Sequence, residues 1–143
     1  MEPPSRQPIG FWTARAAEAV RARTRGALKE IGVSQPEWWV LHQLSLHPEG
    51  VERAAVVVTI GPNETPAVID SAIDSAIEKG WIEAAGARLL PSEVGAALFE
   101  RAAALQQALQ AERMVGITAE DFATTITVLQ KTIVNVGGDA WHW

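Results

Sequence analysis

The spacing of apolar residues predicts a mostly helical chain with one short hairpin. Apolar side chains recur at helical spacing over residues 9–31, from Ser34 to near Pro48, and over 65–79, 92–113 and 117–136. A short helix is expected over 52–60 from its context, although Val56–Ile60 has strand propensity. Trp81–Leu90 is typical of two short strands joined at a Gly86 turn. The pattern therefore predicts a mostly α fold with a small β component (α+β).

Start and stop signals support these helix bounds. Ser34-Gln35-Pro36-Glu37 has the spacing of a capping box, with Ser34 as the cap and Glu37 three residues later. Asn63 or Thr65 is expected to cap the fourth helix, and Gly80 to end it. Gly32 and Gly137-Gly138 end the first and last helices.

Length and composition favour a single cytoplasmic domain. At 143 residues the chain can bury one core but not two of ordinary size. It has no cysteine, which excludes disulfides and thiolate chemistry. The longest apolar run, residues 54–58, is too short to cross a bilayer, and no secretory signal is visible. We therefore expect a cytoplasmic protein without a membrane partner.

The order of helix, Gly80, strand, turn and strand is that of a helix-turn-helix followed by a wing, but its charge is wrong for DNA. A duplex-binding surface needs cations that face the phosphates. Over Val51–Leu90 only three side chains are basic and six are acidic, a net charge of 3 − 6 = −3. The basic residues are Arg53, Lys79 and Arg88, and the acidic ones are Glu52, Glu64, Asp70, Asp74, Glu78 and Glu83.

Three segments carry a further signal: residues 33–41 at the second helix, Ile77–Ile82 at the end of the fourth, and Leu90–Gly95 at the start of the fifth. In this order they resemble the MarR family of winged-helix transcription regulators. The resemblance implies one domain over residues 1–143 that forms an intertwined homodimer. Residues 9–31 and 92–137 would form the dimerisation helices, and residues 34–91 the winged helix-turn-helix lobe.

The departures from the family pattern fall on the DNA-facing surface. Ser71 and Ser75 stand where the family often has Arg, and the wing tip Ala84–Ala87 is short, leaving only Arg88. The resemblance places six residues toward DNA: Asn63, Thr65, Ala67, Ser71, Ser75 and Arg88. Two interpretations stay open. Either the protein is a divergent regulator with weak DNA binding, or DNA recognition is lost and the dimer has another task.

The resemblance also implies a small-molecule site between the dimerisation helices and the lobe. Aromatic walls with a cation and an imidazole suit a flat, polar-edged or anionic organic ligand. The expected partner is therefore a small aromatic or hydrophobic compound. His42 lies one turn after Trp38, so the two share a helix face, although a lone His is more often held by a neighbouring polar group than catalytic. The residues expected at this site are Trp12, Arg15, Trp38, Trp39, His42, Phe99 and Arg101.

Signatures of catalysis are sparse. His42 and His47 are five residues apart, on different helix faces, so no metal site and no cofactor are expected. Asp70, Asp74 and Glu78 form an acidic row that is more typical of a solvated face than of acid–base chemistry. The alternative function is a regulator fold that acts on a small hydrophobic metabolite without binding DNA, as an enzyme or an accessory protein, with His42 as its acid or base.

A third possibility is a protein-interaction surface at Val56, Val57 and Ile77, unless these side chains are buried locally. The sequence does not decide whether the Trp141–Trp143 tail covers a pocket, and a free terminus is the default.

Overall fold

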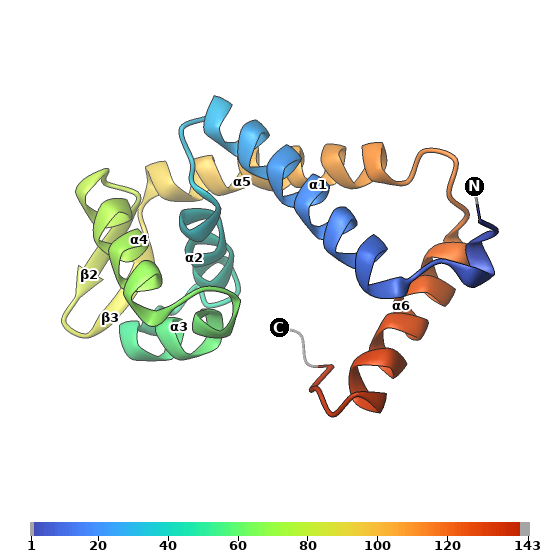
Figure 1. Ribbon diagram of the computed structural model, residues 1–143. Coiled ribbons are helices and arrows are strands. Elements are labelled where there is room, and N and C mark those ends of the chain that lie inside the picture. The colour runs from blue at the N-terminus through green and yellow to red at the C-terminus, as the bar shows by residue number, and fades with distance from the viewer. Residues whose placement is uncertain (1, 141–143) are drawn as a thin grey trace. The chain divides into compact units, whose positions relative to one another are not determined.

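The computed structural model describes residues 2–140 and contains six α-helices and a three-stranded sheet within that range (Figure 1). The chain divides into two compact units, Met1–Gln106 and Gln107–Trp143. The helices are α1 (Ile9–Glu30), α2 (Gln35–Ser45), α3 (Arg53–Ile60), α4 (Pro66–Glu78), α5 (Glu93–Arg113) and α6 (Ala119–Asn135). The strands are β1 (Val51–Glu52), β2 (Ile82–Ala85) and β3 (Arg88–Pro91), and two short 3-10 turns are η1 (Pro4–Arg6) and η2 (Gly61–Asn63). The mostly helical prediction with one hairpin is confirmed.

Side-chain caps set the helix starts that the sequence predicted. The Ser34 Oγ accepts from the Glu37 N–H at 3.2 Å, and the Glu37 carboxylate accepts from the Ser34 N–H at 3.0 Å, so the capping box is complete. Thr65, rather than Asn63, caps α4 by accepting from the Val68 N–H.

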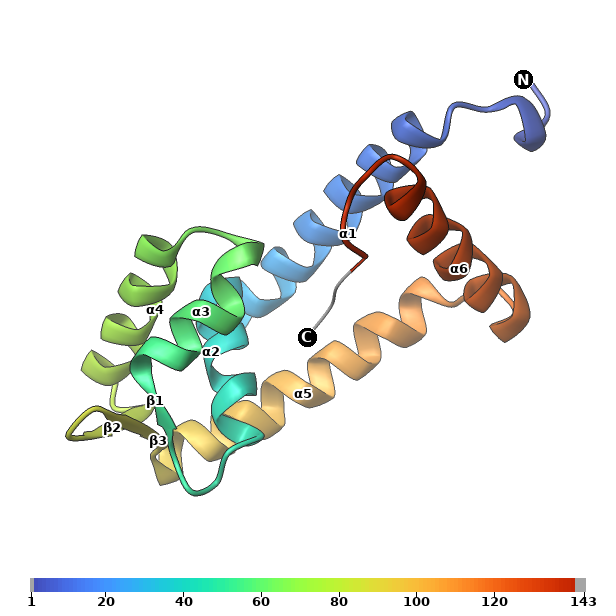
Figure 2. The ribbon, with the colours of Figure 1, turned by 90° about the horizontal axis from the view of Figure 1, so that it is seen from below.

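The sheet has the order β1-β3-β2 and is antiparallel throughout, and its strands lie together in the second view (Figure 2). The hairpin turns at Gly86, whose φ of 64° lies in the left-handed region that favours glycine. The sequence did not predict β1, because its two residues become a strand only by pairing with β3, and no local pattern signals such a pairing.

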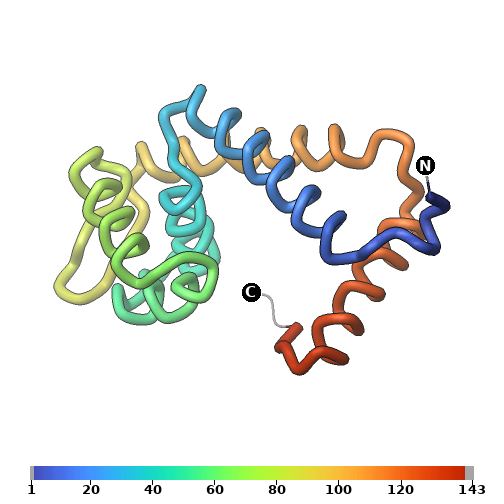
Figure 3. The backbone as a smooth tube through the Cα atoms, viewed as in Figure 1, coloured from blue at the N-terminus to red at the C-terminus, as the bar shows by residue number. Residues whose placement is uncertain are grey.

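The core of the first unit lies between α2, α3, α4 and the sheet, with Leu28 from the C-terminal end of α1 and with Leu98 and Ala102 from α5. The backbone paths of these elements can be followed in Figure 3. The largest fully buried side chains there include Leu41, Leu44, Ile60, Ile69, Ile73 and Leu89. Val56 belongs to this core and is only 1% exposed, so its proposed place on an interaction surface is wrong. Val57 and Ile77 are half-buried against the same core, and the exposed valine of α3 is Val58. Val56 lies on the side of α3 that faces the core, and Val58 lies on the side that faces solvent.

Gly95 lets α5 approach the hairpin closely. A Cβ atom at this position would overlap the carbonyl oxygen of Trp81. The Ser92 N–H also donates to that carbonyl, at 2.9 Å. Only glycine permits this contact, which fixes the start of α5 against the strand that follows α4.

The second unit consists of the end of α5 and α6. Thr118 caps α6 by accepting from the Asp121 N–H at 3.0 Å. None of the α6 residues is buried, and its predicted apolar stripe, which includes Phe122, Ile126 and Ile133, is about 40% exposed at each of these three residues. No helix among the described residues is both long enough and apolar enough to span a bilayer.

Candidate functional site

The outer face of α4 carries small and acidic side chains. Ala67, Ser71, Asp74 and Glu78 follow one another at helical spacing, and all four are exposed. This face presents two carboxylates and no cation, which opposes a polyanion.

Arg53, at the start of α3, is held against α4 by two of its carboxylates. Its Nε donates to Asp70 Oδ1 at 3.0 Å, and its Nη2 donates to Asp74 Oδ1 at 2.8 Å and to the Asp70 carbonyl at 3.1 Å. Burial acts to lower the pKa of Arg53, but the hydrogen bonds to Asp74 and Asp70 outweigh it and raise that pKa. The acidic row of α4 is therefore partly an internal ion-pair network, not only a solvated face.

The other two basic side chains of residues 34–91 also meet carboxylates. Lys79 Nζ lies 2.8 Å from Glu37 Oε2 and 4.5 Å from the centre of the Trp81 ring. Arg88 Nε lies 3.8 Å from Glu52 Oε1. Each cation of the lobe thus has an acidic partner within the same chain.

Glu37 is the buried centre of one of these pairs, and its side chain is only 5% exposed. Burial acts to raise its pKa, but hydrogen bonds from Lys79 and Ser34 outweigh that effect, so the pKa lies below its ordinary value. The Ser75 hydroxyl also donates to Glu37 Oε2, at 3.3 Å. Glu37 therefore ties the first turn of α2 to the C-terminal end of α4.

The remaining predicted DNA-facing residues surround the start of α4 and the wing. Asn63, Thr65 and Ala67 are exposed there, and the Thr65 hydroxyl is used as the helix cap. Ser75 is half-buried toward Glu37, while Arg88 is exposed on the wing. The hairpin turns after only four residues in each strand, so its tip stays close to the lobe.

A shallow apolar depression of about 550 Å³ lies beside the Arg53–Asp70 pair. Ala54, Val57, Val58 and Ala87 line it, and Val58 is 76% exposed. The lining therefore combines these apolar side chains with the charged Glu52, Arg53 and Asp70.

Three aromatic rings stack where α2 packs on α5. The Trp38 and Phe99 rings are almost parallel, with centroids 5.5 Å apart, and His42 stacks on Trp38 with a centroid distance of 5.6 Å. Burial lowers the pKa of His42, because the charged imidazolium loses its hydration there. The sequence prediction that Trp38 and His42 share a face is confirmed, and Phe99, which was predicted for the same site, stacks with both of them.

A groove of about 290 Å³ between α2 and α5 borders this aromatic cluster. Phe99 forms part of its wall, together with Leu41, Leu44 and Ala96, and Ser45 and Glu100 add polar groups. An apolar groove with an aromatic wall and few polar groups suits a small flat organic molecule.

The other four residues predicted for the ligand site do not belong to the aromatic cluster of Trp38, His42 and Phe99. Trp12 and Arg15 are on the N-terminal half of α1, where Trp12 donates to Gln7 and Arg15 lies over the Phe11 ring. Trp39 is half-buried against the core, and Arg101 is exposed on α5. Within one chain, the contacts of Trp12 and Arg15 do not include the aromatic cluster.

Among residues 2–140, no group of three or more His, Asp or Glu side chains lies close enough to hold a metal ion.

Several solved protein structures have a fold similar to that of this chain. A MarR family protein of Mycobacterium tuberculosis, solved in complex with DNA, superposes with a TM-score of 0.71 at 25% identity, over 88% of this chain and 98% of that chain. The fold is that of the MarR family. CouR of Rhodococcus jostii, solved with p-coumaroyl-CoA, gives a TM-score of 0.74 at 24% identity, over 88% of this chain and 91% of that one. No protein-family model and no curated protein matches the sequence.

In the order of elements, α4 stands where the sequence analysis expected the fourth helix of a helix-turn-helix, and β2–β3 form the hairpin that follows it. The sequence did not predict that Arg53 pairs with α4, since Asp70 lies 17 positions after Arg53. The only sequence pattern that indicates these ion pairs is the spacing of Asp70 and Asp74. The two residues lie one helical turn apart, so both carboxylates can reach one guanidinium.

Proposed function

We propose that this chain is a homodimeric MarR-like regulator that binds a small aromatic ligand and whose DNA recognition is weakened. The observation that carries the proposal is the clamp of Asp70 and Asp74 on Arg53. A guanidinium held by two carboxylates of the recognition helix cannot approach a phosphate without breaking both pairs. Lys79 is paired with the buried Glu37, which leaves Arg88, exposed and 3.8 Å from Glu52, as the most loosely held cation among residues 34–91.

Binding to DNA depends on the number of phosphates that a protein neutralises, and affinity falls steeply with salt when that number is large. With the lobe cations paired and the exposed face of α4 acidic, few such contacts can form. We expect a shallow salt dependence and an affinity in the non-specific range.

The ligand part of the proposal rests on the groove between α2 and α5 and on the Trp38, His42 and Phe99 rings beside it. The similar structures support the ligand class. CouR was solved with p-coumaroyl-CoA, and the Mycobacterium tuberculosis protein also with salicylic acid and with p-aminosalicylic acid. An aromatic acid is therefore the first ligand to test.

Fluorescence anisotropy with genomic duplex fragments at about 150 mM salt tests the DNA part of the proposal. The wild-type protein should bind no tighter than about 1 µM, the non-specific range, with little selectivity. The double variant Asp70→Asn/Asp74→Asn frees Arg53 and removes two negative charges, so it should bind several-fold more tightly.

The control is Glu18→Gln/Glu30→Gln, which makes the same charge change on α1. It should raise DNA affinity much less than the α4 double variant does. Saturable, sequence-selective binding of the wild type well below micromolar would contradict weakened recognition, and an unchanged affinity in the α4 double variant would contradict the role of the clamp.

A further inference from the structure

The apolar depression beside Arg53 lies where α3 meets the hairpin, and its volume is about 550 Å³. It shares no lining residue with the groove between α2 and α5. Val57 and Val58 of α3 line it, and Ala87 lines it from the turn between β2 and β3. Val58 is 76% exposed, more than any other large apolar side chain of residues 34–91. An exposed apolar side chain at a concave surface is typical of a site that a partner covers.

Two carboxylates of α4 are held in fixed positions beside this depression. Asp70 lines it, and Asp74 lies one turn further along the helix. Arg53 fixes both, by donating to Oδ1 of Asp70 at 3.0 Å and to Oδ1 of Asp74 at 2.8 Å. These side-chain bonds use one oxygen of each carboxylate, and the two side chains are 51% and 69% exposed. Since an ionised carboxylate accepts more than one hydrogen bond, each can still accept from a donor outside the lobe.

The charge of the surrounding lobe favours a basic partner. Residues 51–90 carry six acidic and only three basic side chains. Glu52 also lines the depression, and Glu83 is exposed on the hairpin. Such a field attracts a cationic segment and repels a polyanion. An apolar centre bordered by charged groups is also the arrangement that protein interfaces show.

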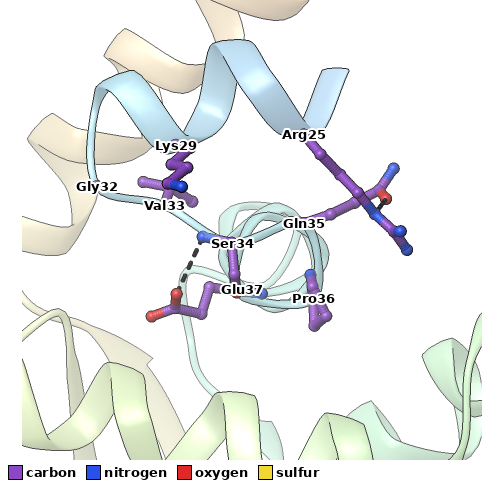
Figure 4. Close-up of a pocket in the computed structure, with 8 residues that line it drawn as sticks. All are labelled: Arg25, Lys29, Gly32, Val33, Ser34, Gln35, Pro36 and Glu37. Atoms are coloured by element: carbon purple, nitrogen blue, oxygen red, sulfur yellow. Dashed lines mark hydrogen bonds between the residues drawn. The ribbon is translucent and has the colours of Figure 1, made fainter. Parts of the chain in front are cut away.

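The cavity between the end of α1 and the start of α2 does not offer this combination (Figure 4). Arg25 and Lys29 point away from each other there. Arg25 donates to Gln35 Oε1 at 3.1 Å, and the Glu37 carboxylate accepts from the Ser34 N–H. The cavity therefore does not direct two like charges at one ligand.

We propose that the depression and the two aspartates beside it form a docking site for a basic amphipathic segment of a partner protein. An aliphatic side chain of that segment would enter the depression and cover Val57 and Val58. An arginine or lysine nearby in the segment would pair with Asp70 or Asp74. The site is separate from the α2–α5 groove and from the exposed stripe of α6, so it depends neither on a small ligand nor on the homodimer.

A synthetic peptide titrated against the full chain tests the site by fluorescence anisotropy. The probe is a fluorescein-labelled peptide of about 14 residues, with leucines at helical spacing and arginines at the flanking positions. One matched peptide has glutamine in place of each arginine, and another has alanine in place of each leucine. The wild-type chain should bind the probe about tenfold more tightly than either matched peptide, because both charge and apolar contact contribute.

Val58→Ser tests the apolar part of the site. This variant should weaken binding of the probe about fivefold, because a buried valine contact is lost. Val58 is exposed, so its replacement should leave the fold intact. Val115→Ser is the matched control, because Val115 is 81% exposed outside the lobe, and should leave the affinity unchanged.

The double variant Asp70→Asn/Asp74→Asn tests the charged part. It should weaken binding of the probe about tenfold, whereas the same variant should bind duplex DNA more tightly. These opposite signs distinguish failure of the docking site from failure of the proposed DNA defect. Glu18→Gln/Glu30→Gln makes the same charge change on α1 and should alter the affinity for the probe much less.

Three results would overturn the docking site. The first is equal binding of the probe and the glutamine peptide, and the second is equal affinity of Val58→Ser and Val115→Ser for the probe. The third is a smaller mass of Val58→Ser than of the wild type in sedimentation equilibrium without peptide, which would assign the depression to a second copy of the chain.

Discussion

Single charged side chains in this protein have more than one structural task. Glu37 completes the capping box of α2, pairs with Lys79 and accepts from Ser75, all within a nearly buried environment. Buried carboxylates are tolerated when their hydrogen-bonding capacity is filled in this way. Its low pKa means that the folded state favours the ionised form.

Glu37→Gln should lower the free energy of unfolding at pH 7 by about 1–3 kcal/mol, because Lys79 loses its partner and the cap is weakened. Since the pKa of Glu37 is lowered in the fold, its stabilisation is complete above the ordinary value of about 4.3 and is lost as the pH falls through the folded value. Urea denaturation between pH 7 and pH 3 measures both effects.

The variant should therefore show a smaller loss of stability on acidification than the wild type. Glu78→Gln, on the exposed face of α4, is the control and should change the stability by less than about 0.5 kcal/mol. Equal acid sensitivity in Glu37→Gln and the wild type would contradict this account.

The aromatic cluster gives a second prediction for single residues. Phe99→Ala removes one wall of the α2–α5 groove and a stacked ring, so it should weaken binding of salicylate about tenfold in a calorimetric titration. Val58→Ala trims an exposed side chain of similar apolar character on α3, and should leave salicylate binding unchanged. Equal affinities in both variants would place the ligand elsewhere.

Among the elements, helix ends and close contacts decide the arrangement. The predicted starts of α2 and α4 are confirmed, because each depends on a local cap and a cap can be recognised from a few consecutive residues. β1 was missed because its partner strand lies far along the chain, and the burial of Val56 because Val56–Ile60 is apolar on every side.

Gly95→Ala tests the contact between α5 and the hairpin. The added methyl group would overlap the Trp81 carbonyl, so we expect a loss of about 1–3 kcal/mol in the free energy of unfolding. Gly26→Ala, in α1, is the matched control, because a Cβ atom there meets nothing within 4 Å. That variant should be more stable than the wild type by about 0.5–1 kcal/mol. Thermal and urea unfolding distinguish the two opposite signs.

At the scale of the whole molecule, the exposed apolar surface of α1 and α6 supports the proposed homodimer. Phe11 and Trp12 on α1, and Phe122, Ile126 and Ile133 on α6, are each between 40% and 49% exposed. Monomeric proteins rarely expose so many large apolar side chains on consecutive turns.

Sedimentation equilibrium should therefore give twice the mass of one chain. Ile126→Asp/Ile133→Asp places two charges on the apolar stripe of α6 and should yield monomers or unfolded chains, because burial of an unpaired carboxylate is costly. Gln130→Asp adds a charge on the same helix at an exposed polar position, and should remain dimeric. A monomeric wild type would contradict the dimer.

The sequence alone determined the helix order, the caps, the hairpin and the scarcity of basic residues on the reading face, because periodicity, capping and charge are local or additive properties. It also placed Trp38 and His42 on one helix face. Only the tertiary structure decided which charges meet: Arg53 with Asp70 and Asp74, Lys79 with Glu37, and Arg25 with Glu64. Such pairs join residues between 17 and 42 positions apart, where contact depends on how the helices pack and not on any local pattern.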